Sequence, residues 1–455
     1  MHIYCGTYGE KLGHVDGKGS GVYVIDIDAT TLTLSEPPAD GSFLGKPQLS
    51  TLTNPTYITS YRESDALYLY IVDERYNGPG AVYVAKVNEA TAELTLLGSP
   101  VPASDGEDGV ACCYIEVAPG GTHVVVANYM AGSICSIARS AADGTLDPAS
   151  AQYLQFPPAS HPVSYPGANA ARQEKAHAHM CLFSKGTEGG MMTVLVPDLG
   201  SDCLWCVPFD ASSSKTPLGA PTRSAGPGGG LAGATHPALL GGGPRHACLH
   251  PRMPILYVCY ELTSLVACFA LNPTTGGLAE DVPPLGVWNA LEGIDSRSTF
   301  LTNEQPPTDA PPATAAGGAG GLYGAFVEQA ANPEQTSVLL PSGHGRTLCS
   351  DSKTSLGAIR ILPDGSHVLV SSRIVGGPGA LSAIPLTAEG HFAPSPVRIT
   401  STLGTTPRDF IVLSKETALV ANQDDDKIVV LSHGQQARLL TEDVPTPVCL
   451  CVGAL

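Results

Sequence analysis

Short apolar segments alternate with turns along most of the chain. The clearest copies of this pattern begin at Cys112, Arg245, Ala358 and Arg408. In each copy small and β-branched residues fill a run that ends at Gly, Asp or Asn, which is typical of antiparallel strands joined by tight turns. One such unit cannot bury its own apolar faces and has to stack against its neighbours. The pattern therefore predicts an all-β repeat architecture.

The two chain ends complete one further unit. Less complete copies begin near Asn54 and Ala176, which brings the number of full units to six. The N-terminal stretch has the pattern of second, third and fourth strands without a first strand: IYCGTYGE followed by GVYVIDIDATTLTLSE. The C-terminal stretch has the pattern of a first strand alone: PVCLCVGAL from Pro447. Pairing them would close a ring and remove exposed sheet edges. We predict a seven-bladed β-propeller of four-stranded antiparallel blades, closed by its N- and C-terminal segments.

The chain is expected to form a single propeller domain over residues 1–455, because all-β rings routinely exceed the usual domain size. Three surface insertions are predicted, near 156–175, 211–243 and 286–355. The last contains PPTDAPPATAAGGAGG, whose composition cannot bury enough apolar surface to order itself.

Charge and cysteine use restrict the partners. The formal net charge is −18, with 24 Lys and Arg, which argues against nucleic acid as the main partner because phosphate backbones are held by clustered basic residues. The 13 cysteines lie mostly in apolar runs, where they act as small buried hydrophobes rather than disulfides. No apolar segment reaches membrane-spanning length. We expect a soluble, cytoplasmic protein without a membrane partner.

Propeller geometry predicts where polar residues meet. The start of each first strand and the end of each second strand lie at one rim of the channel. First strands place there His177, His179, Arg245, His246, Arg408 and Asp409. Second strands add Asp73, Glu74, Asn128, Tyr129, Asp198, Glu261, Arg373, Asn422 and Gln423. Strand-end polar residues often tie turns together, but a guanidinium cluster in an acidic protein indicates a small carboxylate or phosphate ligand.

No cofactor or metal is predicted. His177 and His179 are two apart on a strand and share a face, but no matching third or fourth ligand is evident. Two glycine-rich runs begin at Gly226 and Leu239. They do not form a nucleotide-binding motif, because they follow no Rossmann strand and carry no Walker lysine.

Several motifs resemble a known family. They are RQEKAHAH (172–179), VPDLGSD (196–202), GGPRHACLHP (242–251), LYVCYEL (256–262), AIRILPDGSHVLVSSR (358–373), TPRDFIVL (406–413) and LVANQDDDKIVV (419–430). Together they resemble the seven-bladed lactonase family, which contains propeller-type 6-phosphogluconolactonases and the carboxymuconate cyclase-like 3-carboxy-cis,cis-muconate lactonizing enzymes. The resemblance implies His179, Arg245, Glu261 and Arg373 as active-site positions. The chain departs from the usual family pattern at Tyr260 and Ser372.

These residues suit opening of an anionic sugar lactone such as 6-phosphogluconolactone. Water attack needs a base and a positive partner for the oxyanion. His179 or Glu261 is the candidate base, Arg245 stabilises the oxyanion, and Arg373 or Arg408 holds the anionic tail. We assign substrate binding to His177, His246, Arg408, Asn422 and Asn128.

Two alternatives stay open. In a muconate-type cycloisomerisation the same arginines would clamp the substrate and His179 or Glu261 would act as the acid. A non-catalytic propeller that binds a metabolite or a protein would keep the ring without needing His, Glu and Arg together at one rim.

Overall fold

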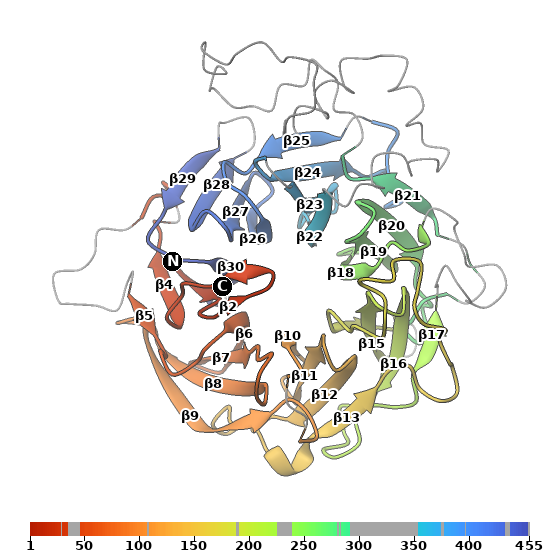
Figure 1. Cartoon of the computed structure of the whole chain (residues 1–455), viewed down its shortest axis with the longest axis horizontal. Helices are drawn as coiled ribbons and strands as arrows, with labels where there is room; N and C mark the ends of the chain where they lie inside the picture. Colours follow the sequence, from red (N-terminus) through yellow and green to blue (C-terminus); the bar gives the residue numbers. More distant parts are fainter. Residues whose placement is uncertain are drawn as a thin grey trace.

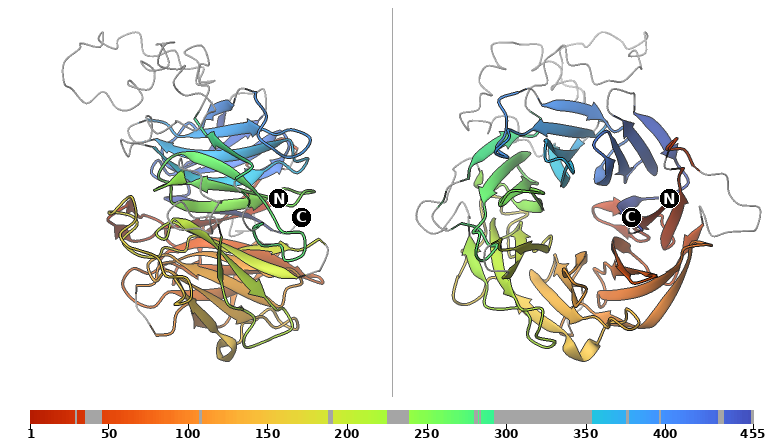
Figure 2. Two further views of the ribbon diagram at one scale, coloured as in Figure 1. Left: turned by 90° about the vertical axis from the view of Figure 1, so that its right-hand side faces the viewer. Right: turned by 180° about the vertical axis from the view of Figure 1, so that it is seen from behind.

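The chain forms a ring of seven four-stranded antiparallel sheets around a central axis, as the repeat predicted (Figure 1). Figure 2 shows the same ring from the side and from behind. The computed structural model describes residues 1–28, 30–34, 46–106, 109–187, 191–224, 239–279, 282, 284–291, 354–374, 377–395, 397–432 and 437–453.

Blades 1 to 4 follow one another along the chain. Blade 1 consists of β6 (Pro55–Glu63), β7 (Ala66–Asp73), β8 (Ala81–Asn88) and β9 (Glu93–Pro102). Blade 2 consists of β10 (Cys112–Val117), β11 (His123–Asn128), β12 (Ser133–Ala138) and β13 (Gln152–Gln155), with the short 3₁₀ helix η1 (Pro148–Ser150) before β13. Blade 3 consists of β14 (Leu182–Lys185), β15 (Met192–Asp198), β16 (Cys203–Phe209) and β17 (Thr222–Ser224). Blade 4 consists of β18 (Pro244–Leu249), β19 (Ile255–Tyr260), β20 (Leu265–Ala270) and β21 (Gly286–Asn289).

The remaining blades include the one that joins both termini. Blade 5 consists of β22 (Thr354–Ile361), β23 (His367–Ile374), β24 (Ala380–Pro385) and β25 (Arg398–Ser401). Blade 6 consists of β26 (Pro407–Ser414), β27 (Thr417–Asn422), β28 (Lys427–Ser432) and β29 (Arg438–Thr441). Blade 7 has the order β30 (Pro447–Val452), β1 (His2–Thr7), β4 (Val22–Asp26) and β5 (Pro47–Gln48). A separate hairpin is formed by β2 (Lys11–Leu12) and β3 (Val15–Asp16).

The ring closes where the sequence predicted. The C-terminal strand β30 pairs antiparallel with β1, with Ile3 opposite Val452 and Gly6 opposite Cys449. Closure gives blade 7 its innermost strand, because β30 lies at the axis and β1 follows outward (Figure 1). Both chain ends are thereby held inside a sheet, and β1 has no unpaired edge.

The hydrophobic core is divided among the interfaces between blades. For example, Tyr70 and Val72 of β7 pack with Ile115 of β10 and Val124 of β11. A comparable cluster joins β1 and β30 to blade 6 through residues such as Leu450. Each blade therefore buries its faces only by contact with its two neighbours.

Two of the predicted insertions contain an outer blade strand. β17 lies inside 211–243, and β21 lies at the start of 286–355. Residues 156–175 are fully described and connect β13 to β14 without a strand. Residues 225–238 and 292–353 lie outside the described part of the chain.

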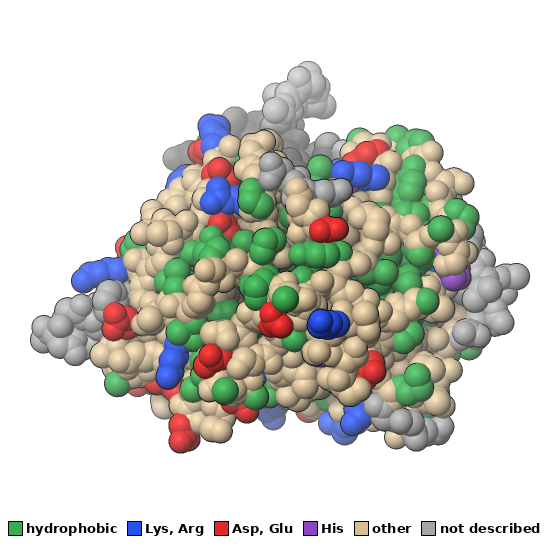
Figure 3. All heavy atoms as spheres, turned by 90° about the horizontal axis from the view of Figure 1, so that it is seen from below, with side chains coloured by type: hydrophobic (Ala, Val, Ile, Leu, Met, Phe, Trp, Pro, Cys, Tyr) green, Lys and Arg blue, Asp and Glu red, His purple; other side chains and the backbone are tan. Residues whose placement is uncertain are grey.

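The surface carries mixed charges. On the flank of the ring in Figure 3, acidic and basic side chains are scattered among uncharged ones, without a continuous basic area among the residues drawn in colour. None of the helices in the described residues has the length and apolarity needed to cross a membrane.

Closure by β30 predicts a large effect of cavity formation in that strand. We expect Leu450→Ala, at a side chain that is 4% exposed in the cluster between blades 6 and 7, to lower the free energy of unfolding by about 2–5 kcal/mol. The matched control Leu439→Ala, at a leucine that is 46% exposed in β29, should change it by less than about 0.5 kcal/mol. Urea denaturation measures both, and equal effects would contradict the role given to β30.

Candidate active site

A repeated irregularity lies at the start of the innermost strands. In five blades the pairing between first and second strand shifts register near its beginning, which leaves a single first-strand residue outside the pairing. These residues are Thr56, Cys113, Arg245, Arg408 and Val448. All five line one small cavity at the channel. A β-bulge redirects a side chain, so the same local irregularity points five different side chains into one place.

The cavity lies where the blades converge. It is lined by Thr56, Tyr57, Glu74, Cys113, His179, Arg245, His246, Arg408, Asp409 and Val448. Its free volume is about 10 Å³, which is close to the room that one water molecule needs. Its walls thus combine two imidazoles, two guanidiniums and two carboxylates.

Glu261 holds three arginines beside this cavity. Its Oε2 lies 3.0 Å from Nε of Arg245 and 3.0 Å from Nη2 of Arg373. Its Oε1 accepts a hydrogen bond of 2.8 Å from Nη2 of Arg172. The carboxylate and Arg245 are buried, whereas the side chain of Arg373 is 16% exposed and that of Arg172 is 41% exposed. The cluster therefore extends from the buried cavity to the open rim.

The charges in this cluster stay ionised. Burial opposes ionisation of Glu261, but Arg373, Arg172 and Arg245 outweigh it and hold the pKa of the carboxyl well below its usual range. Burial, followed by the neighbouring charge of Arg373, lowers the pKa of Arg245 to about 10. At neutral pH Glu261 is an anion that accepts hydrogen bonds, and Arg245 is a cation.

The two imidazoles in the cavity are neutral. Burial and the charge of Arg245 hold the pKa values of His179 and His246 well below the usual range. Nη1 of Arg245 lies 3.3 Å from Nε2 of His246, and a guanidinium can only donate. Nε2 is thus the acceptor, which places the ring proton on Nδ1. This Nδ1–H group is buried and has no hydrogen-bond partner among the described residues.

His179 is held by the cavity wall. Its Nδ1 lies 3.8 Å from Sγ of Cys113, and its backbone N–H donates to the carbonyl of Pro197. Its ring contacts the rings of His246 and Tyr129 edge to face, with centroids 5.4 and 5.2 Å away. The two imidazoles therefore lie side by side.

Arg408 approaches the cavity from the opposite side. Its Nη2 donates to the Tyr8 hydroxyl at 3.0 Å, and its guanidinium lies 5.2 Å from the centre of the Tyr8 ring. Tyr8, Tyr76 and Thr56 in turn donate their hydroxyls to the carboxylate of Glu74. Arg408 and Glu74 are thereby joined through a shared phenol.

Three predicted binding residues are engaged in scaffold contacts. The amide of Asn128 donates to the Ala103 carbonyl and that of Asn422 to the Thr402 carbonyl, each just after the outer strand of the preceding blade. His177 stacks on the ring of Tyr129, and its two nitrogens contact the Tyr129 carbonyl and Glu174. The strand-end rule placed these residues at the same rim, but they do not line the cavity.

Arg172 and Tyr8 were not selected from the sequence. Arg172 comes from the connection at 156–175 and reaches Glu261 from outside the blade pattern. Tyr8 directly follows β1 and is fully buried beside Arg408. The only signal for Arg172 was its place at the start of the motif RQEKAHAH. Nothing in the alternation pattern distinguished Tyr8.

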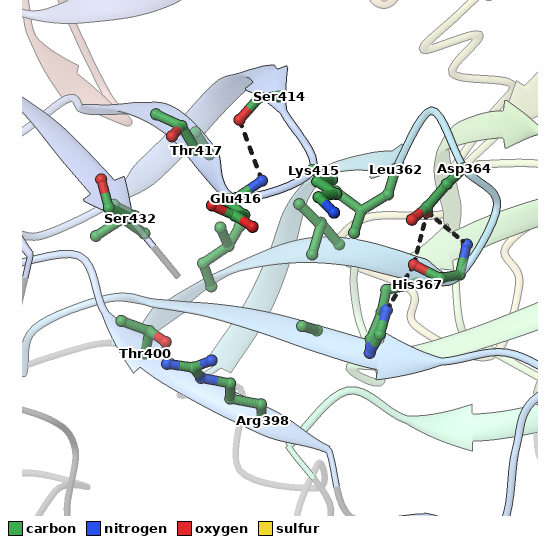
Figure 4. Close-up of a pocket in the computed structure, with 16 residues that line it drawn as sticks. Leu362, Asp364, His367, Arg398, Thr400, Ser414, Lys415, Glu416, Thr417 and Ser432 are labelled. Atoms are coloured by element: carbon green, nitrogen blue, oxygen red, sulfur yellow. Dashed lines mark hydrogen bonds between the residues drawn. The ribbon is translucent and has the colours of Figure 1, made fainter. Parts of the chain in front are cut away.

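A second hollow lies at the opposite rim, between blades 5 and 6 (Figure 4). It measures about 300 Å³, and its floor includes Leu369, Leu381 and Leu431. Asp364 accepts hydrogen bonds from Ser366 in the same turn. This hollow is roomier than the central cavity, but its polar groups complete local turns and do not converge. Among the described residues, no three His, Cys, Asp or Glu side chains gather as metal ligands would.

Known proteins share both the sequence pattern and the ring. The family model "Lactonase, 7-bladed beta-propeller" matches residues 2–284 and 333–452. The 6-phosphogluconolactonase of Bacillus subtilis (strain 168) is 28% identical over 277 residues, which is 61% of this chain. The match spans 64% of that relative's length.

Solved structures show the same fold. A periplasmic gluconolactonase of Pseudomonas aeruginosa superposes with a TM-score of 0.63 at 20% identity, covering 99% of this chain and 98% of that one. A protein from Lactobacillus plantarum superposes with a TM-score of 0.61 at 21% identity, with coverage of 99% and 98%.

The buried carboxylate predicts a selective loss of stability. We expect Glu261→Gln to lower the free energy of unfolding at pH 7 by about 3–5 kcal/mol, because Arg245 loses its buried countercharge. The control Glu89→Gln, which breaks the exposed pair with Arg62, should cost at most about 1 kcal/mol.

The pH dependence of this loss has a defined sign. The pKa of Glu261 is depressed in the folded state, so its contribution is present above the unfolded pKa of about 4.3 and disappears as the pH falls through the folded value. Denaturation of native and variant protein at several pH values measures this, and a difference that grows on acidification would contradict it.

Proposed function

Because this chain belongs to the family of seven-bladed β-propeller lactonases, we propose that it hydrolyses an anionic sugar lactone of the 6-phosphogluconolactone type at the mouth of the channel, over the central cavity that has room for about one water molecule. The proposal rests on one observation. The Arg245–Glu261–Arg373 cluster lies directly beside the neutral imidazoles of His179 and His246. It joins cations for an anionic substrate to groups that accept and donate protons.

The rim is suited to hold the anionic tail of the substrate. Arg172 and Arg373 are partly exposed beside the cavity, and Arg408 lines it. Arginine presents a planar fork of donors that matches carboxylate and phosphate oxygens. Four guanidiniums face the carboxylates Glu261 and Glu74, and the third carboxylate, Asp409, is paired with Arg360 at 2.8 Å. This region therefore carries a surplus of positive charge inside an acidic protein.

The cavity supplies the groups that ester hydrolysis needs. His179 is uncharged at neutral pH and accepts the proton of the attacking water. His246 has a buried Nδ1–H without a partner among the described residues, and it donates to the oxygen that becomes negative as water attacks the lactone carbonyl. Arg245 adds its positive charge beside His246. The ring oxygen then leaves with the proton as the C–O bond of the lactone breaks.

Glu261 acts as a positioning residue. Arginines occupy both of its carboxylate oxygens, whereas His179 lines the cavity, and this geometry favours His179 among the two candidate bases. The carboxylate instead fixes Arg172, Arg245 and Arg373 around one point. Removing it would release three cations that the site needs in defined places.

The cycloisomerase alternative makes different demands. It needs a general acid that protonates carbon, whereas His179 and His246 are both uncharged at neutral pH because burial and Arg245 lower their pKa values. Two of the relatives described above are named as lactonases. We therefore place hydrolysis first and keep muconate-type acids as a control substrate.

We also propose a reducing, cytoplasmic location. Apart from Cys206, the cysteines of the described residues are buried and free, which suits such a compartment. One structural relative is named as periplasmic, so the proposal rests on the cysteines and not on the family.

The proposal is tested by hydrolysis of 6-phosphogluconolactone, corrected for spontaneous opening. We expect native protein to be active and His246→Phe to lower kcat by about 100- to 1,000-fold, the usual effect of losing an oxyanion donor. His367→Phe, at the opposite rim, is the matched control and should retain native activity. Inactive native protein, or an equally active His246→Phe variant, would overturn the proposal. Cyclisation of a muconate-type acid instead would favour the alternative.

The depressed pKa of His179 predicts an unusual acid limb. An ordinary histidine base loses activity around pH 6.5, but burial and Arg245 keep His179 unprotonated at lower pH. We expect kcat/KM to stay level from pH 8 down to about 6.5 and to fall only at lower pH. Initial rates across this range measure it, and a midpoint at or above 6.5 would rule out His179 in its observed surroundings as the base.

A further inference from the structure

The β2–β3 hairpin is fixed above the inner strands of blade 7. Its approach is anchored by Asn54 of the neighbouring blade, whose Oδ1 accepts from the backbone N–H groups of Gly9 and Glu10. Nδ2 of the same residue donates to the Glu10 carboxylate at 2.8 Å. Figure 1 shows β2 beside β30 at the inner side of the ring. The hairpin is therefore joined to two adjacent blades.

Close packing restricts its position further. A Cβ on Gly17 would lie 2.2 Å from the Glu10 carbonyl oxygen, and one on Gly19 would lie 2.1 Å from Oγ1 of Thr7. Val15 is buried against Tyr8 and Val448, and Val448 also lines the central cavity. The hairpin thus fits directly onto the wall of the site.

The tip of this hairpin carries His14, which has no part in the mechanism above. A Cβ on the adjacent Gly13 would meet nothing within 4 Å, and His14 itself is exposed. The His14 ring contacts Tyr8 edge to face at 5.6 Å and Tyr76 at 5.4 Å between centroids. These are the two phenols that bind Glu74, and Tyr8 also binds Arg408.

Charged side chains from several parts of the rim also affect the pKa of His14. Partial burial, followed by Arg408, lowers its pKa, and Arg172 and Arg373 contribute in the same direction. Glu74 acts in the opposite direction. Arg172 precedes blade 3, whereas Arg373 belongs to blade 5 and Arg408 to blade 6. The contacts of His14 with Tyr8 and Tyr76, the two phenols that bind Glu74, place its ring close to the cavity that Glu74 lines.

We propose that His14 contacts the substrate, and that the β2–β3 hairpin is a fixed wall of the mouth that recognises the anionic tail beside Arg408. The inference rests on the proposed lactonase function and adds a specificity-determining residue to it. Tyr8 and Tyr76 support the ring by contact, and the residue is otherwise exposed at the tip of the hairpin.

The chemistry fits a binding role more closely than a catalytic one. A neutral imidazole offers one N–H donor and one acceptor, and a phosphate or carboxylate accepts that N–H. Binding of an anion favours the protonated ring, so the anion raises the pKa of His14. His14 lies on the rim side of Tyr8, whereas His179 and His246 line the cavity itself.

Steady-state kinetics test the contact. We expect His14→Leu to raise KM for 6-phosphogluconolactone about 10-fold, the effect of losing one hydrogen bond to a charged group, with kcat within about twofold of native. His14→Gln keeps a donor and an acceptor and should recover part of the loss. His391→Leu removes an exposed histidine from the β24–β25 turn at the opposite rim and should leave KM unchanged.

A second measurement does not need turnover. The NMR titration of the His14 ring, assigned by its loss in His14→Gln, should shift to higher pKa when inorganic phosphate is added. An unchanged KM in His14→Leu together with a phosphate-insensitive ring would overturn the proposal. If native protein hydrolyses no lactone, the proposed function fails, and the phosphate response alone then decides whether His14 is an anion contact.

Discussion

Ring closure through β30 and β1 is the constraint on which the rest of this structure depends. A blade has two apolar faces and buries them only against its neighbours, so an open ring would expose faces and a sheet edge at both ends. Pairing Ile3 with Val452 and Gly6 with Cys449 removes that edge. The same closure sets the first strands around the axis, where their initial residues meet at short range. The site is a consequence of this convergence.

The β-bulges decide which side chains of the converging strands reach the cavity. Regular alternation would send neighbouring side chains to opposite faces of a blade, where they would join the apolar interfaces. A register shift frees Thr56, Cys113, Arg245, Arg408 and Val448 from that alternation and directs them to the cavity. The scaffold can thus stay similar from blade to blade while the freed residue differs. One blade contributes a guanidinium at the position where another contributes a thiol.

Burying this much charge is costly unless every cation has a partner. Glu261 meets that requirement for Arg172, Arg245 and Arg373 with a single carboxylate. Arg408 is coupled to Glu74 through Tyr8. The arrangement also separates roles, because strong ion pairing keeps Glu261 from acting as a base and leaves proton transfer to imidazoles that burial has made neutral. Stability and function therefore depend on the same few contacts.

The sequence by itself determined the seven blades, the closing strand and the rim that carries Arg245, His246 and Arg408, because strand period and turn residues are local properties. The same rule placed Asn128 and Asn422 at that rim, whereas the folded ring commits their amides to hydrogen bonds with the end of the preceding blade. It also brought Arg172, Tyr8 and His14 to the site from connections that no repeat describes. Which rim residue faces the cavity depends on β-bulges and on contacts between distant segments. Neither of these produces a periodic pattern in the amino-acid sequence.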